Sequence, residues 1–401
     1  MDSAINTAAR ALAAGDPLAA LDLVALRQDA PGLALRGVAM AQLGELARAK
    51  QLLQQATDRF DEAETLARAR CVTACSEVAL AMRDLGPHED LPDAIAVLES
   101  GGDHANATHA RLLELRRMLL LGRIDEAESQ RQRLEIEGMP PALGAIAELA
   151  TAEIAMRRIQ ARAAAAAVDE AHEQALRAGI PALVAETESA RQRLRQPAAR
   201  TPSPEGLRPL RLPEVEDLLA SEGFVVNACR RTVGMASDLI SLARRPVLFE
   251  LAASLASAWP EAVDRETLVR LVFDAKVSES LRARLRVEVG RLRALLRGRA
   301  LIEATADGFA LRTSGDAEVH VLYPPIDGEH GAVMALLADG APWSTSALAL
   351  ALGVSQRTAQ RALSELRESG RVRSIGRARA LRWLAPPVLD FTTVLLLPVL
   401  G

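Results

Sequence analysis

The chain has 401 residues, of which 49% are hydrophobic and 25% are charged, and its formal net charge at pH 7 is −4. This length predicts two to four domains with cores of ordinary size, so we expect a soluble globular protein. No stretch approaches the roughly 18 consecutive apolar residues that a membrane helix requires, so no membrane association is expected. The first residues carry no basic and apolar leader, and there are only three cysteines, which favours a reducing, cytoplasmic location.

Charge is distributed unevenly along the chain. Residues 1–200 carry 23 basic and 29 acidic side chains, whereas residues 201–401 carry 25 basic and 23 acidic ones. Five prolines between residues 196 and 213 separate these halves, and because proline blocks helix propagation we expect an extended linker over residues 197–213. Among 48 basic residues only Lys50 and Lys276 are lysine, so the number of arginines does not by itself indicate nucleic-acid binding.

Residues 1–196 predict about ten amphipathic helices joined by short turns, with almost no strand. A glycine recurs at the end of one helix, with an alanine five residues later; the pairs are Gly15 with Ala20, Gly44 with Ala49, and Gly122 with Ala127. The unit around Gly44 adds Gly37, Leu53 and Ala56. Small residues at this spacing let two helices pack closely, so we expect helical hairpins that stack on one another.

At these positions the segment resembles a tetratricopeptide repeat array, although its units are separated by 29 and 78 residues. The resemblance implies an N-terminal α-solenoid. Such a stack offers a concave surface to a peptide, a partner domain or a second copy of the chain.

The cysteines of this half favour a structural role, with redox or metal sensing as the alternative for Cys71 and Cys75. Cys71 and Cys75 are four residues apart and share a helix face, so we expect small buried residues, and no histidine is near in sequence to complete a metal site. His104 and His109 do not share a helix face and are expected at the surface. We expect no cofactor.

Residues 214–320 predict short strands, three helices and a closing hairpin around Asp307-Gly308. This order is the outline of a winged helix. The first helix is expected over residues 246–258, and the second begins at Asp264-Arg265-Glu266.

The third helix, over residues 278–297, is the basic one. Leu281, Leu285, Val289, Leu292, Leu295 and Leu296 fill one core-facing stripe. The exposed side is flanked by arginines, and residues 282–299 hold seven arginines and one acid. Long arginines on both flanks suit phosphates on both sides of a major groove, so we expect DNA contacts here. The candidate residues of this module are Arg282, Arg284, Arg286, Arg291, Arg293, Arg297 and, in the hairpin, Thr305.

The segments Arg245-Pro-Val-Leu-Phe-Glu-Leu251, Val263-Asp-Arg-Glu-Thr-Leu268 and Gly290-Arg-Leu-Arg293 resemble the DNA-binding domain of OmpR/PhoB-type response regulators. Two residues depart from that pattern. Glu288 stands where the family often carries a base-contacting polar or basic residue, and Ala283 where an arginine is frequent, so phosphate binding is expected more than base reading. Gly290 costs about 1 kcal/mol relative to alanine in a helix interior, and close approach to a groove would explain it.

Residues 326–385 predict a second module with helices over residues 331–338, 344–352 and 356–369. Gly353 fits the sharp turn before the last helix, Val354 fills the core between the helices, and Ser355 caps the last helix. Residues 371–384 then alternate polar and apolar around Gly376, as a hairpin does. Residues 357–382 hold eight arginines and two acids.

Residues 347–383 resemble the winged helix-turn-helix domains of bacterial MarR and GntR regulators. Arginine pairs with guanine edges and glutamine with adenine, so the outward residues of the last helix suit base reading and those of the hairpin suit phosphates. The candidates are Ser355, Gln356, Arg357, Gln360, Arg361, Ser364, Arg371, Arg373, Arg377 and Arg379. The apolar tail, residues 386–401, is too short to span a bilayer and predicts a strand or an arm between subunits.

The expected fold is therefore mainly α, with an α-solenoid of tetratricopeptide-like hairpins followed by two winged helix-turn-helix domains. No phosphate loop, nucleophile elbow or zinc-protease motif is present in the sequence, so no catalytic residue is expected. The pattern predicts a sequence-specific transcription regulator that binds double-stranded DNA, as a homodimer. The alternative is a protein-interaction scaffold that uses the repeat surface, with the winged helices for dimerisation.

Overall fold

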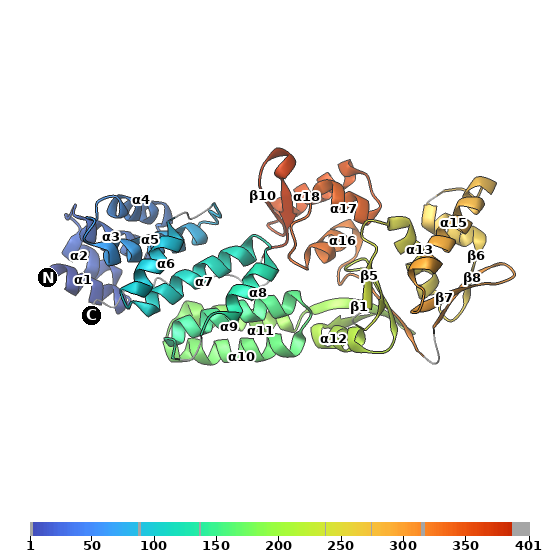
Figure 1. The fold of residues 1–401 in the computed structure, drawn as a ribbon, viewed down its shortest axis with the longest axis horizontal. Helices are drawn as coiled ribbons and strands as arrows, with labels where there is room; N and C mark the ends of the chain where they lie inside the picture. Colours follow the sequence, from blue (N-terminus) through green and yellow to red (C-terminus); the bar gives the residue numbers. More distant parts are fainter. Residues whose placement is uncertain are drawn as a thin grey trace. The chain divides into compact units, whose positions relative to one another are not determined.

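The computed structural model describes residues 3–86, 90–135, 138–236, 238–273, 275–313 and 317–386, without the side chains of Glu329 and Arg379. Its described residues form 18 α-helices and four small sheets, so the expectation of a mainly helical protein is confirmed. The chain divides into two compact units (Figure 1). The first is built mainly from Met1–Ile154 and Ala166–Arg191, and the second from Ala155–Ala165 and Gln192–Val388.

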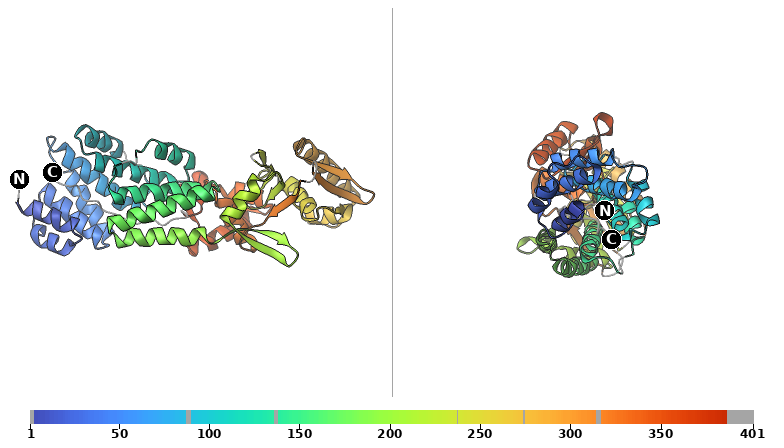
Figure 2. Two further views of the ribbon diagram at one scale, coloured as in Figure 1. Left: turned by 90° about the horizontal axis from the view of Figure 1, so that it is seen from below. Right: turned by 90° about the vertical axis from the view of Figure 1, so that its left-hand side faces the viewer.

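The N-terminal half of the chain is helical throughout its described residues. From α1 to α8 each helix packs against the next along the chain. The helices are α1 (Ser3–Ala13), α2 (Pro17–Val24), α3 (Ala30–Gln42), α4 (Leu46–Thr57), α5 (Thr65–Ala81), α6 (Leu91–Ser100), α7 (His104–Leu120), α8 (Ile124–Gln132), α9 (Pro141–Arg157), α10 (Ala161–Ala178) and α11 (Pro181–Leu194). Figure 2 shows α10 and α11, in green, side by side, and the His172 and Thr187 side chains lie 2.9 Å apart between them.

The recurring glycine–alanine spacing marks a helix end followed by a buried contact. Gly44 adopts a φ of +85°, which favours glycine, and Ala49 in the next helix has no exposed surface. Gly15 with Ala20 and Gly122 with Ala127 repeat this arrangement. At Gly37 a Cβ atom would lie 2.7 Å from Cγ of Leu53, so glycine there permits the close packing of α3 on α4 that the sequence predicts.

The expected surface position is wrong for one of the two histidines. His104 is exposed, but His109 is buried, and its Nε2 lies 3.3 Å from a carboxylate oxygen of the equally buried Glu77. The spacing in sequence did not show this, because the partner belongs to a different helix. Burying a polar ring requires such a partner.

Cys71 and Cys75 lie on one face of α5, buried and half-buried respectively. Burial raises the pKa of the Cys71 thiol to about 12 and also raises the pKa of Cys75. The Cys71 thiol is therefore neutral at pH 7, and it donates to the Leu53 carbonyl oxygen over 3.3 Å. This agrees with the expectation of small residues in the core.

Residues 197–211 do not form the extended linker that their prolines suggest. They form an antiparallel hairpin of β1 (Pro197–Ser203) and β2 (Gly206–Arg211). Proline lacks an N–H but is tolerated at strand edges, and a two-stranded sheet consists of edges. The hairpin is tied down by two hydrogen bonds between the backbones of Arg200 and Tyr323, at 2.9 and 2.7 Å.

The next segment builds a sheet on which three helices pack. After α12 (Leu212–Ala220), the strands β3 (Phe224–Asn227), β4 (Thr232–Met235) and β5 (Asp238–Ser241) are antiparallel neighbours. The later strand β9 (Val319–Leu322) returns to pair in parallel with β3, so the sheet order is β5-β4-β3-β9. Phe224 and Val226 of β3 belong to the core that this sheet shares with the helices.

Between β5 and β9 lie three helices and a second sheet. The elements are α13 (Pro246–Ser257), β6 (Ala262–Asp264), α14 (Arg265–Phe273), α15 (Glu279–Leu295), β7 (Ala300–Ala304) and β8 (Gly308–Thr313). The strand order is β6-β8-β7, with all pairs antiparallel. The predicted helix bounds over residues 246–258 and 278–297 and the predicted hairpin at Asp307-Gly308 agree with these elements within two residues.

The last described elements form a separate small core. They are α16 (Gly328–Leu337), α17 (Thr345–Leu352), α18 (Gln356–Glu368), β10 (Arg373–Ile375), the 3₁₀ turn η1 (Ala378–Ala380) and β11 (Arg382–Leu384). Trp383 lies at the centre of this core, together with Leu336, Leu348 and Leu363. Beyond Pro386, the apolar tail lies outside the described residues, and so does its expected strand or arm.

Candidate nucleic-acid interface

The turn between α17 and α18 has the local structure that its sequence predicts. Ser344 and Ser355 begin the two helices, and their hydroxyls accept hydrogen bonds from the Ala347 and Thr358 N–H groups, both over 3.1 Å. Gly353 ends α17 in the left-handed conformation, with a φ of +70°. Because all three residues act locally, the sequence predicts where α17 ends and where α18 begins.

The α18 helix has one apolar face and one polar face. Ala359, Ala362, Leu363 and Leu366 are buried, as predicted. On the other side Arg357, Gln360 and Arg361 are exposed, together with Ser355 and Gln356, while Ser364 is half-buried. The side chains that could read base edges therefore share the outward face of one helix.

One acid lies beside this face. The Glu365 carboxylate is 2.9 Å from Nε2 of His330 in α16 and 4.0 Å from Nε of Arg361. The contact with the arginine is long and exposed, and such pairs are weak. Glu365 is therefore an acid that lies against the outward face of α18.

The hairpin after α18 is anchored by an aromatic residue. In the pairing of β10 with β11, Ser374 faces Trp383, whose indole N–H donates to Oγ1 of Thr345 over 2.9 Å. The backbones of Trp383 and Trp343 exchange two hydrogen bonds, of 2.7 and 2.9 Å. The hairpin is thus attached to α17 as well as to α18.

The candidate arginines of this hairpin have different surroundings. Arg377 is exposed, and Arg373 is half-buried. Arg371 is half-buried and lines a cavity described below. The side chain of Arg379 lies outside the described part of the structure. Among these candidates, Arg377 is therefore the one whose described side chain is exposed.

The α15 helix buries most of the predicted leucine and valine stripe. Leu285, Val289, Leu292 and Leu296 are buried, and Leu281 and Leu295 are half-buried. Ser278 accepts from the Leu281 N–H at its start, over 3.4 Å. Five of the six candidate arginines are exposed and Arg282 is half-buried.

Acidic neighbours offset part of the charge on α15, and two of them, Glu266 and Glu279, lie outside the counted residues 282–299. Arg282 is 2.8 Å from Glu266 of α14, Arg286 is 3.3 Å from Glu279, and Arg291 is 2.9 Å from Glu288. Glu266 is 16 residues away in sequence, so only the fold brings it to Arg282. The uncompensated positive charge of this helix is therefore smaller than the sequence indicates.

The remaining arginines of α15 have other neighbours. Arg293 donates to the Ile302 carbonyl oxygen over 2.8 Å, which links the helix to β7. The Arg284 guanidinium lies 4.9 Å from the centre of the Phe273 ring, and Arg297 is exposed near the helix end. Thr305 is half-buried, and its hydroxyl accepts from the Gly308 N–H over 3.0 Å, so it shapes the turn of the hairpin.

The structure shows the surroundings of the two unusual residues of α15, Glu288 and Gly290. Glu288 is buried, lines a surface pocket together with Pro246 and Val247 of α13, and lies 2.9 Å from the exposed Arg291. A Cβ atom added at Gly290 would meet nothing within 4 Å. The glycine is therefore not required by packing within the described structure.

Sequence reasoning missed one residue that supports this surface. Arg265, at the start of α14, donates to the carbonyl oxygens of Ala306 and Thr305 over 2.8 and 3.2 Å and lies over the Phe309 ring. It thereby holds the β7–β8 turn against α14. The contacts span 40 residues, so no local signal could have indicated them.

No family model, curated protein or solved structure matches this chain. Among the described residues no cluster of histidine, cysteine or acidic side chains could hold a metal ion. None of the described helices has the length and apolar character needed to cross a bilayer.

Proposed function

We propose that this protein is a sequence-specific DNA-binding transcription regulator whose recognition helix is α18. The observation that carries the proposal is the outward face of α18. There Arg357, Gln360 and Arg361 lie together on a helix that is held by a capped, glycine-containing turn. A helix fits the major groove, where arginine pairs with guanine and glutamine with adenine.

The β10–β11 hairpin and α15 supply phosphate contacts in this proposal. Arg377 is exposed in the hairpin, and Arg284, Arg293 and Arg297 are exposed on α15. Neutralising phosphates releases counterions, so affinity should fall steeply with salt. Since Glu288 is buried and is paired with Arg291, we assign α15 to phosphate binding rather than to base reading.

The order of elements supports two winged-helix modules. In each, two helices are followed by a third helix and then by an antiparallel hairpin, α13 to β8 in the first and α16 to β11 in the second. The first also carries a sheet of four strands before and after its helices. These features agree with the resemblance to OmpR/PhoB-type and MarR/GntR-type domains.

The helices of the N-terminal half, in this proposal, form a solenoid that binds a partner or a second subunit. The support is the buried alanines at the repeating positions and the packing of each helix from α1 to α8 on the next. A stack of this kind needs its neighbours for a core and exposes a continuous surface.

The test is selection of DNA from a random pool by the full chain, followed by anisotropy titrations of the recovered duplex across a salt series. Arg357→Ala should cost ~1–3 kcal/mol on the selected duplex and relax preference at one base pair. Arg377→Ala should weaken all duplexes alike. An exposed arginine of α4 that belongs to neither module, Arg48, provides the control variant Arg48→Ala.

Two results would contradict the proposal. The first is a pool that yields no enriched sequence. The second is duplex affinity that stays the same in the Arg357 and Arg377 variants across the salt series. In either case the modules serve protein contacts, and the scaffold interpretation replaces the regulator.

A further inference from the structure

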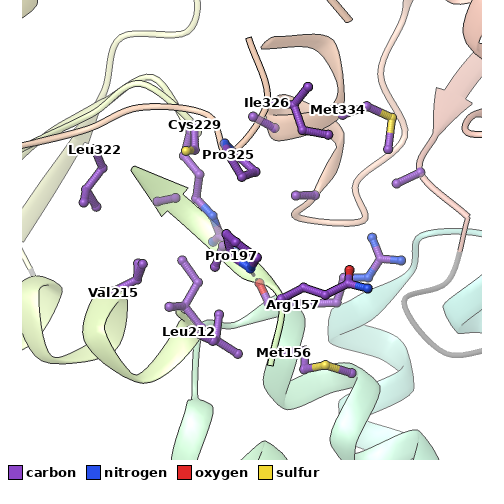
Figure 3. Close-up of a pocket in the computed structure, with 18 of the residues that line it drawn as sticks. Met156, Arg157, Pro197, Leu212, Val215, Cys229, Leu322, Pro325, Ile326 and Met334 are labelled. Atoms are coloured by element: carbon purple, nitrogen blue, oxygen red, sulfur yellow. Dashed lines mark hydrogen bonds between the residues drawn. The ribbon is translucent and has the colours of Figure 1, made fainter. Parts of the chain in front are cut away.

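The second unit contains a cavity of about 540 Å³. Its walls come from the end of α9, from β1 and α12, and from β3, β9 and α16, so segments far apart in the sequence meet there (Figure 3). The volume lies within the range of about 300–1,000 Å³ that is typical of small-molecule sites. Of the residues assigned above to DNA binding, only Arg371 lines it.

Two apolar walls face one another across this cavity. Leu212 and Val215 of α12 lie on one side, and Ile326 and Met334 lie on the other (Figure 3). Val215 and Leu322 belong to a small core cluster beneath the first wall. The cavity can therefore contact the apolar part of a ligand on two sides.

The charged side chains that line the cavity are all positive. Its lining includes four arginines, Arg157, Arg193, Arg230 and Arg371, and no aspartate or glutamate. Cys229 adds no charge at pH 7, because burial raises the pKa of its thiol to about 12. The side-chain oxygen of Asn227 accepts a hydrogen bond from the backbone N–H of Arg230 over 3.2 Å. The other polar group of this carboxamide is its NH₂, which is a donor.

The arginines are held in place by the surrounding backbone. Arg230 donates to the Arg157 carbonyl oxygen over 2.6 Å, and Arg157 donates to the Pro386 carbonyl oxygen over 3.0 Å. Burial lowers the pKa of Arg230, which means that its charge is incompletely solvated. Asp339 interacts electrostatically with Arg230 and Arg157 but does not line the cavity, and burial raises the pKa of its carboxyl.

We propose that this cavity binds a small amphipathic carboxylate, with its apolar body between α12 and α16 and its carboxylate at the arginines. Guanidinium groups form charge-assisted, two-pronged hydrogen bonds with carboxylates, and a carboxylate would complete the solvation of buried cations. The proposal is independent of the function proposed above, since ligand binding can be measured without DNA.

The experiment is calorimetric titration of the full chain with decanoate, below its micelle concentration, with decanol and acetate as matched probes. Decanoate should bind saturably with a stoichiometry of one, and decanol and acetate should each bind at least about tenfold more weakly. Arg193→Gln should weaken decanoate binding about tenfold, as expected for the loss of one charge-assisted hydrogen bond. Arg195→Gln, an exposed neighbour outside the cavity, is the matched control.

A second variant keeps the test independent of the arginines. Ala338→Trp adds an indole at an exposed position of the lining and should abolish decanoate binding without altering the thermal unfolding of the chain. The proposal is overturned by an absence of saturable binding or by decanol binding as tightly as decanoate. It is also overturned if Arg193→Gln and Ala338→Trp both bind decanoate like the unaltered protein.

Discussion

The Trp383 indole N–H donates a 2.9 Å hydrogen bond to Oγ1 of Thr345, which joins the last strand of the C-terminal hairpin to the start of α17. The ring itself is buried beside Leu348 and Leu363. This contact between residues 38 positions apart acts together with the backbone hydrogen bonds between Trp383 and Trp343 to hold the hairpin against the helices.

Thr345→Val should remove this bond and leave the indole N–H without its acceptor. We expect a loss of about 1 kcal/mol in the free energy of unfolding and weaker binding to all duplexes, because the hairpin loses a support. Urea titration followed by tryptophan fluorescence measures the first effect. Thr345→Ser keeps the hydroxyl and should behave like the unaltered chain; equal losses in both variants would show that the hydrogen bond is unimportant.

Gly290→Ala tests why α15 carries a glycine. The added methyl group meets nothing within 4 Å, so the variant should raise the free energy of unfolding by up to about 1 kcal/mol. If α15 enters a groove closely, the same variant should weaken duplex binding. Ala294→Gly, on the exposed side of the same helix, should destabilise the chain by a similar amount. Unchanged duplex affinity in Gly290→Ala would remove close approach as the explanation.

Glu266→Gln combined with Glu279→Gln should increase DNA affinity. The two carboxylates lie 2.8 and 3.3 Å from Arg282 and Arg286, and their removal frees both guanidinium groups for phosphates. We expect tighter binding at low salt and a salt slope steeper by about 1 to 2, from fluorescence anisotropy across a salt series. The exposed Glu222→Gln serves as the control for net charge. An identical gain in that control would mean that the local ion pairs are irrelevant.

Cys71 should make stability depend on pH in the alkaline range. Its pKa is raised from 9.0 to about 12 in the folded chain, so the unfolded chain loses this proton first. Unfolding is therefore favoured as pH rises from about 9 to 12, and the stabilisation present below pH 9 is lost. Urea midpoints of the unaltered protein and of Cys71→Ala should converge with rising pH over this window. A constant difference would contradict the raised pKa.

Gly37→Val should disrupt the packing of α3 on α4. Its Cβ would approach Cγ of Leu53 to 2.7 Å and the Leu53 backbone nitrogen to 3.2 Å, so a shift of the helix is required. We expect a loss of about 1–3 kcal/mol in thermal or urea unfolding. Because Gly144 has more room, with Gln174 at 3.3 Å as the nearest neighbour, Gly144→Ala should cost less. Equal costs at both positions would argue against the close contact.

The boundaries and caps of the helices could be predicted from the sequence because they depend on neighbouring residues. Ser344, Gly353 and Ser355 act within four positions of themselves, and the leucine and valine stripe of α15 follows from the helical period. The buried alanines that follow Gly15, Gly44 and Gly122 were visible for the same reason. Helix caps and hydrophobic periodicity depend on the order of residues along the chain, so they can be predicted from the sequence.

Contacts between distant segments were decided only by the tertiary structure. The pairing of His109 with Glu77, the neutralisation of Arg282 by Glu266 and the parallel pairing of β3 with β9 all join separate elements. The prolines of residues 197–211 suit either a linker or an edge hairpin, and the bonds between Arg200 and Tyr323 select the hairpin. The sequence does not show whether an arginine lies in water, beside a carboxylate or in a cavity wall, so its neighbours in space determine which charges remain for a ligand.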